Sequence, residues 1–228
     1  SEAQPQSPTA RLLIGRAQLA LGEEEAALDA FESVLGDTPR IDITRRGFFV
    51  GVTTKRGERI YLNEVSSGIV LYTELLARRG EEDRLQRGLD ALETRWPELG
   101  AVEGAHALLV ALRGDPKRAW RRLDEALARH PSDDSLAAFV GSLAVRDPGG
   151  LTPAARERLR QEGAAVSAYN AALQLHRDGH SGLCVEILGG IADNPSLTKP
   201  RNQLRVQCAQ ATGDARIAEQ AIADAGGV

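Results

Sequence analysis

Residues 8–41 carry the clearest structural signal in the chain, and they read PTARLLIGRAQLALGEEEAALDAFESVLGDTPRI. Apolar residues recur at the spacing of one helix face on both sides of Gly22, which is typical of two amphipathic helices joined by a tight turn. Pro39 ends the second helix, because its ring clashes with the preceding turn and it has no amide hydrogen to donate. The stretch therefore predicts a helical hairpin.

The same pattern recurs along the chain. Turn-type glycines at Gly22, Gly80, Gly114, Gly179 and Gly213 each separate two stretches of helical periodicity, and two of the four intervals between them are 34 residues. A small or apolar residue follows each glycine after five positions and a larger apolar residue follows four positions later. An internal repeat of this length indicates stacked hairpins that bury their apolar faces against one another. The recurring pairs are Ala27 and Phe31, Leu85 and Leu89, Ala119 and Leu123, Cys184 and Leu188, and Ala218 and Ile222.

Residues 8–41 resemble the tetratricopeptide repeat (TPR) family, whose helix-turn-helix unit has about 34 residues. The matching positions are Ile14 and Gly15 for the family's Leu-Gly step, Gly22 in the turn, Ala27 and Phe31 on the second helix, and Pro39 at the end. The other repeats depart from the pattern, with Thr73, Ala107, Ala172 and Val206 in place of Gly15. The resemblance implies an all-α TPR-type solenoid of about six repeats in a single domain, residues 8–225.

Individual helices follow from the apolar periodicity and from the turn residues between them. A strong turn signal at 147–150 makes the fourth repeat, residues 134–163, degenerate, and Thr152 before Pro153 predicts a fresh helix start there. Residues 1–7 are expected to form a disordered tail. The expected helices span 8–21, 24–36, 63–79, 82–96, 100–113, 116–129, 133–146, 152–162, 165–178, 181–193, 198–212 and 214–225.

Residues 42–63 form an insertion with a different period. Apolar and other residues alternate around Phe48 and again around Ile60, which predicts a β-hairpin. The segment is basic within an acidic chain, so it is either a binding element or a loop that packs on its own scaffold. The candidate hairpin contacts are Phe48, Phe49, Arg56, Arg59 and Tyr61.

The TPR resemblance also implies where a partner binds, because the first helix of each repeat lines the concave groove in that family. The matching residues are mostly apolar, which favours an apolar helix or extended segment as the guest over a carboxylate clamp. Tight winding that buries these residues is the alternative. The candidate groove residues are Leu12, Leu13, Arg16, Val70, Leu71, Glu74, Leu108, Leu112, Phe139, Tyr169, Asn170 and Leu173.

Composition excludes several classes of protein. The net charge of −4 argues against a nucleic-acid-binding surface, and no apolar run is long enough to span a membrane. The chain has no Met, so we expect that it was trimmed from a longer precursor. Its cations are almost all Arg, which hints at a bacterial source. The cytoplasm is the favoured compartment, and the periplasm is the alternative.

No catalytic or metal-binding motif is present in the sequence. His176 and His180 are separated by a helix-breaking Gly179, which argues against a metal pair. No cofactor is expected. Cys184 and Cys208 lie at matching levels of neighbouring helices, where a disulfide is conceivable, but buried thiols are the commoner outcome and are expected here.

These observations predict a non-enzymatic scaffold that binds a protein or peptide through the groove or the hairpin. The alternative is a structural homo-oligomerisation module or a regulatory domain of a larger bacterial chain. Fold alone does not fix function, so the choice depends on the binding surfaces.

Overall fold

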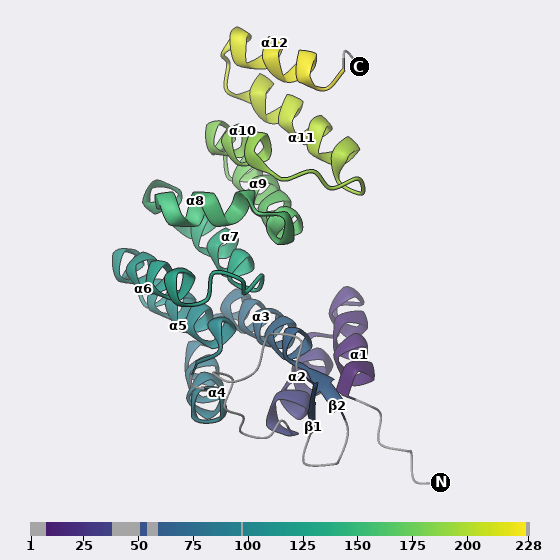
Figure 1. The fold of residues 1–228 in the computed structure, drawn as a ribbon, viewed down its shortest axis with the longest axis vertical. Helices are drawn as coiled ribbons and strands as arrows, with labels where there is room; N and C mark the ends of the chain where they lie inside the picture. The colour runs from purple at the N-terminus through teal and green to yellow at the C-terminus, as the bar shows by residue number, and fades with distance from the viewer. Residues whose placement is uncertain (1–7, 38–50, 54–58, 97, 227–228) are drawn as a thin grey trace. The chain divides into compact units, whose positions relative to one another are not determined.

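The computed structural model describes residues 8–37, 51–53, 59–96 and 98–226, and these residues are predominantly helical (Figure 1). They form twelve α-helices, two short 3-10 helices and two three-residue strands. The all-α class predicted from the sequence is therefore confirmed. The chain separates into two compact units, residues 1–114 and 115–228, and each is described by itself.

Five helices make up the first unit. Its elements are α1 (Pro8–Ala20), α2 (Glu24–Asp37), α3 (Leu62–Arg79), α4 (Glu82–Arg95) and α5 (Gly100–Leu112). Helix α1 packs against α2, and α3 packs against both α2 and α5. Helix α4 contacts α3 and α5, and the contacts of α3 with α1 and α5 join helices that are not adjacent in sequence.

Seven helices make up the second unit. Each later helix packs against the one before it, and α9 also packs against α7. The elements are α6 (Pro116–Arg129), α7 (Leu136–Arg146), the 3-10 helix η2 (Pro148–Gly150), α8 (Pro153–Arg160), the 3-10 helix η3 (Glu162–Ala164), α9 (Ala165–Arg177), α10 (Ser181–Gly190), α11 (Thr198–Ala211) and α12 (Ala215–Asp224).

The turns between paired helices depend on glycine. The five turn glycines that define the repeat all adopt positive φ, between 70° and 89°. L-amino acids with a side chain rarely adopt this left-handed region, whereas glycine enters it at no steric cost. The turns predicted at Gly22, Gly80, Gly114, Gly179 and Gly213 are thereby confirmed.

The recurring apolar residues form the core of both units. Ala27 and Phe31 are fully buried, as are their counterparts on α4, α6 and α10. A Cβ on Gly15 would lie 2.7 Å from the Phe31 ring, so only glycine allows α1 and α2 to approach this closely. On α12 the equivalent residue, Ile222, remains 38% exposed.

The helix ends agree with the predicted ones to within a few residues, with the largest shifts in the second unit. Helix α7 begins at Leu136 rather than at 133, because the carboxylate of Asp133 accepts hydrogen bonds from the amide and the hydroxyl of Ser135 (3.0 and 2.6 Å) and holds a turn there. Thr152 caps α8 as expected, since its hydroxyl accepts from the amide of Ala155 at 3.2 Å.

Two short strands lie within the predicted insertion. Strand β1 (Gly51–Thr53) pairs antiparallel with β2 (Arg59–Tyr61), with Val52 opposite Ile60. Residues 42–50 and 54–58 lie outside the described part of the chain, so a hairpin over the whole insertion stays a prediction. The predicted tail at 1–7 also lies outside it.

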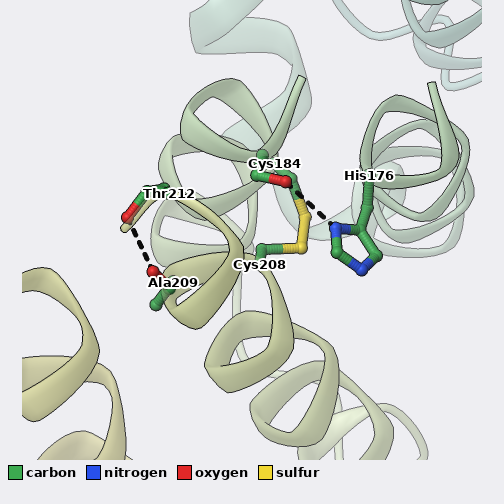
Figure 2. The surroundings of a disulfide bond; sticks show 6 residues. His176, Cys184, Cys208, Ala209 and Thr212 are labelled. Carbon is green, nitrogen blue, oxygen red and sulfur yellow. Dashed lines mark hydrogen bonds between the residues drawn. A yellow bond between two sulfur atoms is a disulfide. The ribbon is translucent and has the colours of Figure 1, made fainter. Parts of the chain in front are cut away.

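Cys184 and Cys208 form a disulfide that joins α10 to α11 (Figure 2). Their Cα atoms are 6.1 Å apart, and both residues are fully buried. The expectation of two free thiols is therefore wrong. Helices α10 and α11 pack against each other, and this packing brings the two cysteine side chains within bonding range.

Candidate functional site

The predicted groove face is partly exposed in the first unit. Leu13 on α1 is 58% exposed, and Arg16, one turn later, is also exposed. Val70, Leu71 and Glu74 on α3 are half-buried. Helices α1 and α3 are in contact, and these five side chains lie on the two helices.

Three of the predicted groove residues are buried instead. Leu12, Leu108 and Phe139 have almost no exposed surface. Leu12 packs against α3, where a Cβ on Gly68 would come within 3.0 Å of it. These side chains contribute to the core and offer no binding surface, as the alternative of buried groove residues anticipates for them.

The remaining groove residues divide between the units. Leu112 on α5 is half-buried and lies in the first unit. Tyr169 and Leu173 on α9 are half-buried, and Asn170 is exposed, all in the second unit. We therefore define the first-helix face as Leu13, Arg16, Val70, Leu71 and Leu112, within the first unit alone.

The five residues predicted as hairpin contacts lie in or beside segments outside the described part of the chain. Phe48, Phe49 and Arg56 lie outside the described residues, and the side chains of Arg59 and Tyr61 are likewise not described. Their proposed role as contacts stays a prediction.

An ion-pair network that the sequence interpretation missed joins α2 to the turn between α3 and α4. Arg78 pairs with Glu24 at 2.8 Å, and Arg79 pairs with both Glu25 and Glu81. Hydrogen bonds from Arg79 and Arg84 lower the pKa of Glu25. Carboxylates at helix starts, such as Glu24 and Glu25, are also favoured there by the helix dipole, so the sequence alone does not single them out as ion-pair partners. The arginines directly before Gly80 were the available signal for a partner.

A pocket of about 440 Å³ lies between α2 and α4, and its floor includes Tyr72 from α3. The Tyr72 hydroxyl donates to a carboxylate oxygen of Glu32 at 3.2 Å, and Arg84 Nε donates to the same oxygen at 3.0 Å. Burial and the nearby Glu32 carboxylate raise the pKa of Tyr72, so its hydroxyl stays protonated and keeps donating. Gly88 also lines the pocket, and a Cβ at this position would overlap the Tyr72 hydroxyl.

A second, larger pocket of about 810 Å³ lies along α11 and α12. Its lining mixes amide side chains, such as Asn202 and Gln203, with apolar Val206 and Ile222. Ile217 on α12 is also 37% exposed. The α11–α12 pair therefore presents apolar surface that no other described residue covers.

The candidate titratable groups are engaged in local structure. His176 Nδ1 lies 3.2 Å from the Ser181 hydroxyl at the turn before α10 (Figure 2), and His180 is exposed. In the described part of the chain, no three His, Cys, Asp or Glu side chains gather as a metal site would require. Burial raises the pKa of Asp133, against the hydrogen bonds from Ser135.

Comparison with known proteins adds no assignment. No protein-family model matches the chain, and no curated protein matches it significantly. None of the helices described here is both long and apolar enough to cross a bilayer. The functional argument therefore depends on the surfaces above.

Proposed function

We propose that this protein is a non-enzymatic interaction scaffold of TPR type, which binds an apolar segment of a protein partner on the first-helix face. The observation that carries the proposal is the contrast between the two helices of the first hairpin. Phe31 on α2 is fully buried, whereas Leu13 on α1 is largely exposed. A contiguous apolar patch on a folded surface can mark a binding site, and the proposal takes Leu13 with the half-buried Val70 and Leu71 as such a patch.

The chemistry of the face favours an amphipathic helix or an extended apolar strand as the guest. Leu13, Val70 and Leu71 supply apolar surface, and the groove candidates include one cation on α1, Arg16, and one anion on α3, Glu74. A guest with apolar residues and an acidic residue near Arg16 would match the apolar surface and the cation. The inserted hairpin at 42–63 is a second candidate contact.

A display selection tests this proposal. Purified protein would be used to select from a library of displayed peptides, and the enriched peptides would then be titrated against variants. We expect apolar peptides to be enriched and to bind the Leu71→Glu variant at least about tenfold more weakly, because a carboxylate would be buried in the contact.

Leu21→Glu is the matched control, since Leu21 is 75% exposed in the same unit but lies beyond the end of α1. Leu108 is unsuitable for this purpose, because it is buried and a charge there would unfold the unit. Failure to enrich any peptide, or equal binding by the Leu71→Glu and Leu21→Glu variants, would overturn the proposal.

Self-assembly is the second candidate function, and the exposed Ile217 and Ile222 on α12 favour it. A homo-oligomer would cover this surface with another copy of the chain. Light scattering across a concentration series would then give a mass that rises with concentration and falls in an Ile222→Glu variant. A constant monomer mass would exclude it.

The disulfide bears on where the protein works. Structural disulfides persist in oxidising compartments and are rare in the cytoplasm of most cells. The pairing of Cys184 with Cys208 thus favours an oxidising compartment, such as the periplasm, over the cytoplasm. Cells that express the natural chain would be quenched in acid and alkylated after denaturation, because both cysteines are buried; both would stay unlabelled in that case and both would be labelled in the other.

A further inference from the structure

The pocket between α2 and α4 carries an excess of positive charge. Three arginines, Arg84, Arg87 and Arg95, line it from one face of α4, and Glu32 is the one carboxylate among its lining residues. The lining therefore has a net charge of +2, whereas the whole chain has −4. A pocket whose lining is positively charged, in a chain whose net charge is negative, favours an anionic ligand.

Only part of this charge is used within the protein. Arg84 is committed to Glu32, at 3.0 Å, and to Glu25 on α2 and Glu81 before α4, both at 3.3 Å. Arg95 donates one N–H to the carbonyl oxygen of Leu35 at 2.8 Å, which holds the guanidinium at the end of α2 and leaves it positively charged. Arg87 is exposed and makes no hydrogen bond or ion pair with any described residue.

The rest of the lining is apolar or compact. Ala91 is exposed and contributes hydrocarbon surface, whereas the Leu35, Leu92 and Tyr72 side chains are nearly buried and form the base of the pocket. Gly88 lets α4 pack closely on Tyr72, because a side chain there would collide with the Tyr72 hydroxyl. The pocket thus offers cationic donors beside an apolar wall, the combination found in sites for small organic anions.

We propose that the α2–α4 pocket binds an oxyanion, a carboxylate or a phosphate group, attached to an apolar moiety, with Arg87 and Arg95 as its donors. A guanidinium presents parallel N–H groups that match two oxygens of either anion. The apolar moiety would lie against Ala91, which is the exposed apolar side chain of the lining. This site involves the second helices α2 and α4, so it stands or falls independently of the first-helix face.

Calorimetric titration of the whole chain tests this proposal with two probes, phenyl phosphate and benzoate. Each carries an aromatic ring, and comparing them identifies which oxyanion the pocket prefers. Arg87→Gln is the diagnostic variant, because Arg87 is exposed and its replacement leaves the core intact. We expect Arg87→Gln to weaken binding about tenfold, since a charge-assisted hydrogen bond is lost.

Arg121→Gln is the matched control, because Arg121 is also exposed and makes no hydrogen bond or ion pair with a described residue, but it lies on α6 in the second unit. It should bind the probes as the unaltered chain does. Thermal melts of both variants would check that each is folded.

Two results would overturn the proposal. One is the absence of binding by either probe to the unaltered chain. The other is equal affinity of the Arg87→Gln and Arg121→Gln variants for a probe that does bind. Inorganic phosphate and acetate complete the series: binding as tight as that of the aromatic probes would contradict the role assigned to the apolar wall.

Discussion

Removal of the disulfide should destabilise the second unit by a predictable amount. Cys184 and Cys208 are 24 residues apart, so the bond closes a loop of that size in the unfolded chain. The loop-closure model then gives a stabilisation of about 3.5 kcal/mol at 25 °C. The suitable perturbation is the double variant Cys184→Ala/Cys208→Ala, since Ala27 and Ala119 occupy the equivalent buried position in other hairpins.

The two tryptophans allow the units to be followed separately. Trp96 is buried in the first unit and Trp120 in the second. In a Trp96→Phe background, urea unfolding monitored by fluorescence reports the second unit alone. With an m value of about 1.5 kcal/mol/M, the double cysteine variant should lower the midpoint by about 2 M urea.

A Trp120→Phe background supplies the internal control, because the first unit contains no cysteine and its midpoint should not move. Addition of a reductant should lower the midpoint of the chain with both cysteines and leave that of the double variant unchanged. Equal midpoints for the two chains, with the disulfide verified by thiol titration, would refute the assigned role of this bond.

Two further substitutions probe packing and pH dependence. Gly15→Ala should lower the free energy of unfolding by about 1–3 kcal/mol, because the new Cβ would press on Phe31. Gly36→Ala is the control, and it should be neutral or stabilising because open space surrounds Gly36. Urea midpoints of the two variants check this expectation, and equal effects would contradict it. Burial raises the pKa of Asp133, so the folded state favours its protonated form, and its contribution is complete below about pH 4 and lost as pH rises through the folded pKa. Relative to Asp133→Asn, the melting temperature of the unaltered chain should therefore fall as pH rises above about pH 4, and a relative rise would show the opposite sign.

Local structure was predictable here because it depends on local chemistry. The turn glycines were identified by spacing alone, since a tight turn between helices needs positive φ and glycine adopts it without strain. Burial of Phe31 and its counterparts followed from the same register. The start of α7 was placed too early because the Asp133 turn competes with the helix.

Features that depend on contacts between residues distant in sequence were harder to predict from the sequence. The bond between Cys184 and Cys208 requires a relative rotation of α10 and α11 that periodicity does not specify. Likewise, Glu25 and Arg79 are distant in sequence, and the charge of the α2–α4 pocket emerges only when α2 packs beside α4. Helical periodicity also cannot separate a groove residue such as Leu13 from a buried neighbour such as Leu12.

Hydrogen exchange in the presence of a selected peptide is the most direct test of the binding account. We expect the bound peptide to slow exchange of the amides of α1 and α3, which carry Leu13 and Leu71, and to leave those of α2 and α4 unchanged. Protection confined to α2 and α4, or to the second unit, would contradict the assignment of the first-helix face as the binding surface.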